Sequence, residues 1–262
     1  MGEHYSKKEL GKDMYQFFIE DENAAEDFVT IEGSDVNHIK NVLRMKPGEK
    51  IRVCTRNGQN YFCSISDITE SFVRADILEK EAESTELPCR IYLFQGLPKN
   101  DKMEWIIQKT VELGVYEVIP VAMKNCVVKL DDKKAKSKVT RWQAIAESAA
   151  KQSKRSLIPE VKMPMSYKEA VAYAKELDVK LVPYENEHGM SGTKAAMEQI
   201  EKGESVAVFI GPEGGFAPEE IALVQDEMQL ISLGKRILRT ETAGIAALAI
   251  LGYQLESSDM IE

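Results

Sequence analysis

The sequence has few residues of the kinds that bind metals or form disulfides. Its 262 residues include four cysteines, Cys54, Cys63, Cys89 and Cys126, and three scattered histidines. No C-x-x-C pair is present. Structural metal sites and disulfide frameworks need close, regular spacings of these residues. We therefore predict no metal and no disulfide, and reduced thiols of the kind found in cytoplasmic proteins.

Long hydrophobic runs are also missing. Hydrophobic residues make up 44% of the chain, but no run approaches the length that crosses a bilayer. The N-terminal stretch MGEHYSKKELGKDMYQFF has no apolar core followed by small residues, which a secretory signal requires. We expect a cytoplasmic protein with no membrane partner. A length of 262 residues suits two modest domains.

Acidic residues outnumber basic ones overall, but the basic residues are concentrated in one segment. The formal net charge is -9, which argues mildly against a nucleic-acid partner. From Lys124 to Arg155, however, ten Lys or Arg face only three Asp or Glu. This distribution fits a basic footprint on an acidic protein. It fits a solvated, flexible lysine loop equally well, so charge alone leaves both interpretations open.

The first third of the chain is typical of a small β-barrel. Short β-prone runs are Tyr15 to Glu20, Phe28 to Gly33, Ile51 to Thr55, Tyr61 to Ile65 and Phe72 to Leu78. Asn57-Gly58 predicts a hairpin turn between two of them. Ser34 is expected to cap a short helix that ends before Lys46-Pro47-Gly48. The charged, unpatterned segment from Glu79 to Pro88 predicts a domain boundary, with residues 1–84 on one side and 85–262 on the other.

After Pro88, strand patterns alternate with helix patterns. Predicted strands are Arg90 to Leu97, Val118 to Met123, Val179 to Pro183, Ser205 to Ile210 and Leu230 to Leu233. Predicted helices are Asp101 to Leu113, Lys138 to Lys154, Ser166 to Leu177, Thr193 to Lys202 and Thr240 to Leu255. The apolar run Ser205 to Ile210 is typical of a strand buried on both faces. The alternation predicts an α/β domain with a mostly parallel sheet.

A glycine-rich turn, Gly211-Pro212-Glu213-Gly214-Gly215-Phe216, follows that buried strand. Its glycines permit positive φ angles and let a ligand approach the backbone closely. Ligands of open α/β sheets bind at the carboxyl ends of strands. The turn is neither a P-loop nor a dinucleotide fingerprint, because the spacings of both are absent. From these residues alone, a ligand loop and a plain tight turn remain equally open.

A second polar segment, Leu233 to Ala243, leads into the last helix. It reads LGKRILRTETA, and its arginines and glutamate could serve helix capping or chemistry. The helix that follows is apolar on almost every side, so we expect it to be buried. Small side chains along it would allow another backbone to approach closely, which suits a subunit interface; they are Ala243, Gly244, Ala246, Ala247 and Ala249.

Together, GPEGGF and LGKRILRTETA resemble the motifs of the SPOUT methyltransferases, and specifically the bacterial 16S rRNA uridine-N3 methyltransferase family. Other stretches resemble the same family in the same order. Lys109 to Val115 is similar to its K-x-x-E-L-G stretch, Glu147 to Arg155 to its E-A-x-x-Q-x-x-R stretch, and His38 to Gly48 to its N-terminal signature. Lys151 departs from the pattern, since an acidic residue is common there. The resemblance covers nearly the whole chain.

The resemblance implies a fold that periodicity does not reveal. Residues 1–84 would form a PUA-like β-barrel that binds RNA, and residues 85–262 a SPOUT methyltransferase domain with a C-terminal trefoil knot. The protein would be a homodimer that acts on 16S rRNA of the small ribosomal subunit. S-adenosyl-L-methionine would be its cofactor. The residues implied in binding that cofactor are Leu181, Pro183, Gly211, Pro212, Glu213, Gly214, Gly215, Leu233, Gly234, Ile237, Leu238, Thr242 and Ala243.

The chemistry at uridine N3 suggests roles for two further residues. N3 carries a proton, so the enzyme must stabilise the uracil anion that forms when that proton leaves. Arg239 is our candidate for this electrostatic role, and Glu241 for orienting it or assisting proton removal; the alternative for Arg239 is a phosphate contact. We expect RNA to be bound by His38, Arg44, Lys46, Lys99, Lys109, Gln152, Arg155 and Arg236.

Two rival functions remain. Some SPOUT enzymes methylate a ribose 2′-hydroxyl, but their last motif resembles S-L-N-x-S-x-A, whereas this chain has L-R-T-E-T-A, which favours a base nitrogen. A non-catalytic RNA-binding protein of ribosome assembly would not need the glycine loop. Binding of S-adenosylmethionine separates the enzyme from the assembly factor.

Overall fold

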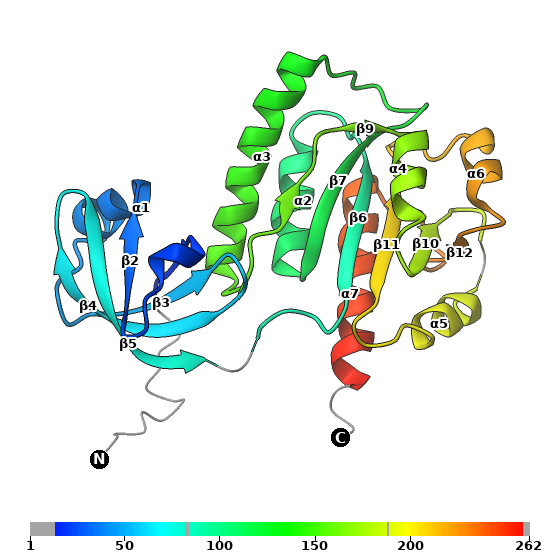
Figure 1. The fold of residues 1–262 in the computed structure, drawn as a ribbon. Coiled ribbons are helices and arrows are strands. Elements are labelled where there is room, and N and C mark those ends of the chain that lie inside the picture. Colours follow the sequence, from blue (N-terminus) through cyan, green and yellow to red (C-terminus); the bar gives the residue numbers. More distant parts are fainter. Residues whose placement is uncertain (1–13, 82–83, 188, 259–262) are drawn as a thin grey trace. The chain divides into compact units, whose positions relative to one another are not determined.

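Two separately packed units make up the chain in its computed structural model, which describes residues 14–81, 84–187 and 189–258. The first unit holds Met1–Glu86 and Ala150–Ile158, and the second holds Leu87–Ala149 and Pro159–Glu262 (Figure 1). The division falls within the charged segment in which the sequence predicts a boundary, while residues 150–158 pack with the first unit. Most of the N-terminal residues that bear on a secretory signal lie outside the described part.

The first unit is built on a curved five-stranded sheet. Its elements are β1 (Gln16–Ile19), η1 (Asp21–Asn23), β2 (Phe28–Glu32), α1 (Ser34–Asn37), η2 (His38–Val42), β3 (Lys50–Thr55), β4 (Asn60–Ile68) and β5 (Phe72–Glu81). The strand order is β1-β3-β4-β5-β2, in which β1 and β3 run parallel and the other pairs antiparallel. The edge strands β1 and β2 also contact each other. The sheet therefore curls nearly into the barrel that the sequence predicts.

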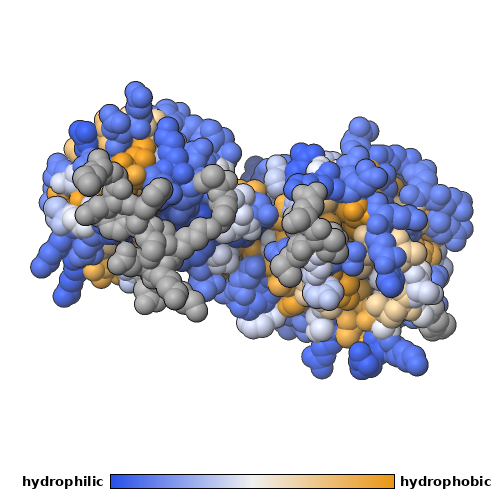
Figure 2. Space-filling model, turned by 90° about the horizontal axis from the view of Figure 1, so that it is seen from below, coloured by the Kyte–Doolittle hydropathy of each residue, from blue (hydrophilic) through white to orange (hydrophobic). Residues whose placement is uncertain are grey.

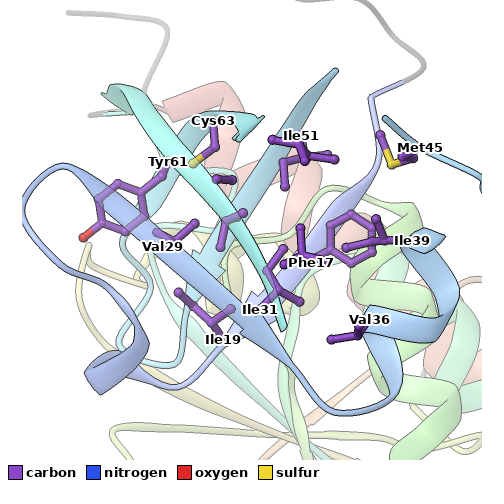
Figure 3. Close-up of a cluster of buried hydrophobic side chains, with 14 residues drawn as sticks. Phe17, Ile19, Val29, Ile31, Val36, Ile39, Met45, Ile51, Tyr61 and Cys63 are labelled. Atoms are coloured by element: carbon purple, nitrogen blue, oxygen red, sulfur yellow. The ribbon is translucent and has the colours of Figure 1, made fainter. Parts of the chain in front are cut away.

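Alternation along these strands creates the core of the first unit. Figure 3 shows its side chains meeting from different elements, with Phe17 and Ile19 from β1, and Val29 and Ile31 from β2. The predicted hairpin turn is present, with Gly58 at a φ of 87° and its N–H donating to Thr55 O at 3.1 Å. Ser34 does not cap the following helix as predicted. Gly33 holds the N-cap position, and Ser34 is the first helical residue.

The segment 150–158 is tied into the first unit by buried polar contacts. The side chain of Gln16 donates to the carbonyl of Arg155 at 2.6 Å. Arg155 itself is buried and forms an ion pair with Glu86, whose other oxygen accepts the N–H of Ser156 at 2.8 Å. Asn60 donates to the hydroxyl of Ser156 at 2.7 Å. These contacts explain why a stretch distant in sequence packs with the first strands.

The second unit is an α/β structure around a parallel sheet. Its elements are β6 (Arg90–Gly96), α2 (Lys102–Glu112), β7 (Val115–Ala122), α3 (Asp132–Gln152, of which residues 150–152 belong to the first unit), β8 (Glu160–Val161), β9 (Met165–Ser166), α4 (Tyr167–Ala174), β10 (Val179–Pro183), α5 (Ser191–Glu198), β11 (Ser205–Ile210), α6 (Pro218–Val224), β12 (Gln229–Ile231) and α7 (Thr240–Ser258). The strand order is β12-β10-β11-β6-β7-β8, with β9 also on β7, and these pairs are parallel. The α/β prediction is confirmed.

The central strand β11 has the bounds and the complete burial that its apolar run predicts. Helices cover both faces of the sheet. In Figure 1, α4 lies in front of it and α7 behind it, where α7 packs on β6, β11 and α2. The chain thus returns from the edge strand β12 to the middle of the sheet before α7 begins. Whether this return forms the trefoil knot implied by the family resemblance stays a prediction.

Two helix starts show what local sequence can and cannot reveal. The capping box at α4 is present as predicted: Ser166 Oγ accepts the N–H of Glu169, and Glu169 accepts the N–H of Ser166 at 2.8 Å. The predicted start of α3 at Lys138 is wrong, because the helix begins at Asp132. Asp131 accepts the N–H of Lys134 at 2.9 Å there. The basic segment is therefore helical, with Ala135 as the only buried residue between Asp132 and Lys138.

Candidate functional site: a cavity at the carboxyl ends of the strands

A cavity of about 640 Å³ opens at the carboxyl ends of β10 and β11. Three chain segments form most of its wall: the end of β10 with the loop after it, the glycine loop after β11, and the loop between β12 and α7. The lining residues are Lys102, Pro183, Tyr184, Glu185, Glu187, Ile210, Gly211, Pro212, Glu213, Gly215, Phe216, Ser232, Leu233, Gly234, Lys235, Arg236, Ile237, Leu238, Arg239, Thr240 and Ala243. This is the edge of the sheet at which α/β proteins bind ligands.

The glycine loop owes its shape to close packing on both sides. Gly215 has a φ of 66°, and its N–H donates to the carbonyl of Pro212 at 2.9 Å, which closes a tight turn. Asn125 braces the loop, donating to the carbonyls of Gly214 at 3.0 Å and Gly215 at 3.2 Å. A Cβ on Gly214 would lie 3.0 Å from that of Asn125. Small residues are thus required both by conformation and by space.

The loop between β12 and α7 is fixed at its start by a reciprocal pair of hydrogen bonds. The hydroxyl of Thr193 donates to the carbonyl of Ser232 at 2.8 Å and accepts its N–H at 3.0 Å. The N–H of Gly234 then bonds to the Ser232 hydroxyl at 3.2 Å, with Gly234 at a φ of 111°. This arrangement turns the chain so that Leu233 and the residues after it face the cavity.

The start of α7 is bonded to the glycine loop. Thr240 donates its hydroxyl to the carbonyl of Gly211 at 2.6 Å, and the buried amide of Gln95, at the end of β6, donates to Thr240 at 2.8 Å. The neighbouring Arg239 is exposed and lines the cavity. Its guanidinium has no hydrogen bond or ion pair with the residues that the structure describes. The fold therefore holds the backbone at Arg239 firmly and leaves its side chain available.

An ion triad links three segments beside the cavity. Lys102, the first residue of α2, places its Nζ 3.1 Å from Glu213 of the glycine loop and 3.1 Å from Glu241 of α7. Hydrogen bonding to Glu213 and then to Glu241 raises the pKa of Lys102 above its ordinary value. Burial acts to raise the pKa of the Glu213 carboxyl. Hydrogen bonding from the N–H of Lys99 and the nearby Lys102 ammonium outweigh this effect and hold the pKa below its ordinary value. Both shifts favour the charged forms of Lys102 and Glu213 at neutral pH.

Most of the cofactor-binding residues implied by the sequence meet at this one cavity. Those in its wall are Pro183, Gly211, Pro212, Glu213, Gly215, Leu233, Gly234, Ile237, Leu238 and Ala243. Three others lie off the wall. Leu181 is buried within β10, Gly214 is packed against Asn125, and Thr242 is exposed on α7. Arg239 lines the cavity, whereas Glu241 lies beside it, paired with Lys102.

The predicted RNA-binding residues are divided between the two units. Arg236 lines the cavity, and Lys99 and Lys109 lie elsewhere on the second unit, Lys109 paired with Glu112 at 2.7 Å. The others belong to the first unit: His38, Arg44, Lys46, Gln152 and Arg155. Within that group, Arg155 is buried and the other four are exposed. The ion pair between Arg155 and Glu86 gives this arginine a role in packing.

The sequence interpretation missed several cavity residues, and Lys102 is the most informative of them. It immediately follows Asp101, the predicted helix start after the carboxyl end of β6, so its place in the sheet could have suggested a site residue. Tyr184, Glu185 and Glu187 follow β10 in the same way. In the described part of the chain, no group of three or more Cys, His, Asp or Glu side chains is arranged to hold a metal ion. No described helix is long and apolar enough to span a bilayer.

Comparison with known proteins places both units in one family. A family model described as an RNA methyltransferase domain matches residues 85–252, and one described as an RNA methyltransferase PUA domain matches residues 31–78. Ribosomal RNA small subunit methyltransferase E of Bacillus subtilis (strain 168) is 40% identical over 231 residues, which cover 87% of this chain and 90% of the relative. Its counterpart in Mesomycoplasma hyopneumoniae (strain 232) is 36% identical, covering 88% and 96%.

A solved structure agrees with these matches. The crystal structure of ribosomal RNA small subunit methyltransferase E from Neisseria gonorrhoeae, bound to S-adenosyl methionine, superposes with a TM-score of 0.79 at 32% identity, covering 91% of this chain and 96% of that one. The family predicted from the sequence motifs is thereby confirmed: this chain belongs to the ribosomal RNA small subunit methyltransferase E family, with a PUA domain followed by an RNA methyltransferase domain.

Proposed function

We propose that this protein transfers a methyl group from S-adenosylmethionine to N3 of a uridine in 16S rRNA of the small ribosomal subunit. The observation that carries the proposal is the cavity, in which the glycine loop and the segment from Leu233 to Arg239 face each other. These are the two segments whose sequences resemble the family's motifs. Such a reaction takes place where ribosomal subunits are assembled, so we place the protein in the cytoplasm.

The cavity fits an S-adenosylmethionine cofactor. A volume of about 640 Å³ lies within the usual range for small-molecule sites. The turn at Gly215 and the bend at Gly234 let the backbone approach a ligand, and Leu233, Ile237 and Leu238 supply apolar surface. When bound, the cofactor supplies a methyl group on a sulfonium, which is transferred by in-line displacement. The protein's task is then to position the acceptor and stabilise its charge.

Arg239 is the residue we assign to charge stabilisation. Uridine N3 becomes a nucleophile only when its proton leaves, and the negative charge then spreads to the neighbouring oxygens. A guanidinium that has no partner among the described residues and is held at the cavity wall can donate hydrogen bonds to such an oxygen. Glu241 is less suited to taking the proton directly, because its carboxylate is paired with Lys102. We therefore favour an electrostatic supporting role for Glu241.

We propose that the first unit binds RNA, with His38, Arg44 and Lys46 among the contacts. Arg44 has a φ of 54°, a left-handed conformation that L-residues other than Asn and Asp seldom adopt. It lies just past η2, where the N–H of Met45 bonds back to the carbonyl of Ile39 at 3.0 Å. Glycine is the usual residue at such a helix end. An exposed arginine in this strained conformation suggests that its side chain contributes to binding at the surface.

We also propose that the protein is a homodimer formed on the open face of α7. The exposed or half-exposed residues along that face are Thr242, Ala246, Ala249, Tyr253 and Glu256. Tyr253 is 74% exposed. Figure 2 shows hydrophobic residues at the surface of the lower end of the second unit, towards which α7 runs in Figure 1. Ala249→Glu and Tyr253→Glu should each give monomers in light scattering, because an unpaired charge in a contact is costly.

The proposed reaction can be tested with purified protein, small ribosomal subunits and S-adenosylmethionine labelled in its methyl group. A methyl on N3 blocks Watson–Crick pairing and stops reverse transcription at one nucleotide, whereas a ribose 2′-O-methyl instead protects the adjacent phosphodiester from alkali. We expect a single stop and no protected dinucleotide. Gly215→Val should abolish the signal by straining the loop. Binding of the RNA without any binding of S-adenosylmethionine would favour the assembly-factor alternative, and a protected dinucleotide would favour the ribose methyltransferase.

A further inference from the structure

Lys102 lies at the junction of the parts that the proposed reaction requires. Its side chain lines the cavity from α2, while its two partners belong to the glycine loop and to the first turn of α7. Oε2 of Glu241 is buried, and its ion-pair partner in the described part of the chain is Lys102. The ammonium of Lys102, 3.1 Å away, is therefore the group that neutralises this oxygen. Glu213 has a second tie, since its Oε1 accepts the N–H of Lys99 at 3.0 Å.

Removing the lysine charge would leave two carboxylates facing each other with no cation between them. Like charges in a partly buried setting repel strongly, because water screens them poorly there. The carboxylates can relieve the repulsion by moving apart or by taking up a proton, and movement would displace the cavity wall, because both are attached to segments that form it. The glycine loop carries Glu213, and the segment that presents Arg239 leads directly into Glu241. The lysine charge thus favours a short separation between the two walls.

We propose that Lys102 is a positioning residue for methyl transfer, which holds the glycine loop and the start of α7 at the separation that binds the cofactor. This inference rests on the proposed function of the cavity. In this role Lys102 does not contact the reacting atoms. Glu213 attaches the glycine loop to Lys102, and Glu241 attaches the start of α7 to it.

The chain offers a matched control for the charge triad. Lys162 also bridges two carboxylates, Glu117 at 3.3 Å and Glu160 at 2.7 Å, and its side chain is 32% exposed compared with 29% for Lys102. Glu117 lies near the start of β7, at the opposite end of the sheet from the cavity. Lys162→Met therefore removes a similar triad far from the site. It removes a cation between two carboxylates just as Lys102→Met does, but should cause no loss of cofactor affinity.

The decisive measurement is calorimetric titration of the full-length variants with S-adenosylmethionine and with 5′-methylthioadenosine, which lacks the amino-acid tail. We expect Lys102→Met to weaken both ligands by about tenfold, the equivalent of about 1.4 kcal/mol, because the wall itself has moved. Lys102→Arg should keep most of the affinity, since a guanidinium can also bridge two carboxylates. The double variant Lys102→Met with Glu241→Gln should recover part of the loss, because it removes the repulsion.

Other outcomes would overturn the inference in distinguishable ways. If Lys102→Met weakens only S-adenosylmethionine and leaves 5′-methylthioadenosine unchanged, Lys102 contacts the cofactor's carboxylate and is a binding residue. If affinity for both ligands equals that of the wild type, the triad is dispensable and the proposal is wrong. Should the wild-type protein itself bind neither ligand, the proposed function of the cavity fails, and not merely the role of Lys102.

Discussion

Thr240 donates its hydroxyl to the carbonyl of Gly211 at 2.6 Å, and this bond joins the last helix to the glycine loop. The hydroxyl in turn accepts a hydrogen bond of 2.8 Å from Gln95. The side chain of Thr240 thus joins the end of β6, the loop after β11 and the start of α7. Between Gly211 and Thr240 the chain runs out to the edge strand β12 and back. The bond therefore also fixes the point at which the chain rejoins the glycine loop.

Thr240→Val tests this arrangement with almost no change in shape. It leaves the Gly211 carbonyl unpaired, which costs about 1–3 kcal/mol when the group is buried. We expect a lower melting temperature and weaker S-adenosylmethionine binding. Thr240→Ser keeps the hydroxyl and should retain both properties. Equal behaviour of the valine and serine variants would show that the hydrogen bond does not hold the loop.

Gly96 gives a second test of loop position. A Cβ on this residue would lie 2.7 Å from the nitrogen of Pro212, a separation that real Cβ atoms do not tolerate. Gly96→Ala should therefore push the glycine loop away from β6 and cost about 1–3 kcal/mol of stability, as overpacking does. Gly192→Ala is the control, since nothing lies within 4 Å of its added Cβ. That helical position should gain slightly from alanine. Chemical denaturation of both variants measures the difference.

Local patterns predicted those parts of the fold in which neighbouring residues determine the structure. Ser205 to Ile210 forms a buried strand with the predicted bounds, and the capping box at Ser166 is present. The start of α3 was missed because Ala135 is the only apolar residue between Asp132 and Lys138. Solvent-facing helix turns of this kind are specified by capping and propensity, which leave a weaker trace in sequence than a buried face does.

The sequence indicates where the site lies, but not which side chains from distant segments meet there. Glycines and strand ends indicate where a ligand binds, whereas the pairing of Lys102 with Glu241 joins segments far apart in the chain. The small residues of the last helix show the same limit. We expected Ala247 and Gly244 to face another subunit, but both are buried within this chain, where a Cβ on Gly244 would lie 3.3 Å from Gln95. A small-residue stripe does not reveal which backbone it approaches.

Arg44→Gly separates a structural from a functional role for that arginine. Glycine adopts a positive φ without the steric penalty, so stability should stay equal or rise by up to about 1 kcal/mol. If Arg44 contacts phosphate, RNA affinity should nevertheless fall, and the slope of log affinity against log salt should decrease by about one. Lys50→Ala, another exposed cation of the first unit, provides the comparison. Unchanged RNA binding by Arg44→Gly would remove Arg44 from the proposed interface.

Arg239→Ala should act on the methyl-transfer step. Its side chain is unpartnered in the described structure and lies at the cavity wall, so its removal leaves the fold and the cofactor affinity nearly intact. Loss of one preorganised donor to a developing anion lowers turnover by roughly 10²–10³. We expect a loss of that order in single-turnover rates at saturating RNA. Lys235→Ala removes another cation from the same wall and should cost much less, because the effect depends on geometry and not on net charge.

Two further measurements distinguish transition-state stabilisation from phosphate binding by Arg239. Arg239→Lys should restore little of the methyl-transfer rate that Arg239→Ala loses, because lysine lacks the planar fork of the guanidinium. Raising the pH should narrow the gap between wild type and Arg239→Ala, since a larger fraction of uridine has then lost its N3 proton before reaching the enzyme, and less stabilisation of that loss is required. If the variant instead loses only RNA affinity, and its single-turnover rate at saturation matches the wild type at every pH, Arg239 is a phosphate anchor.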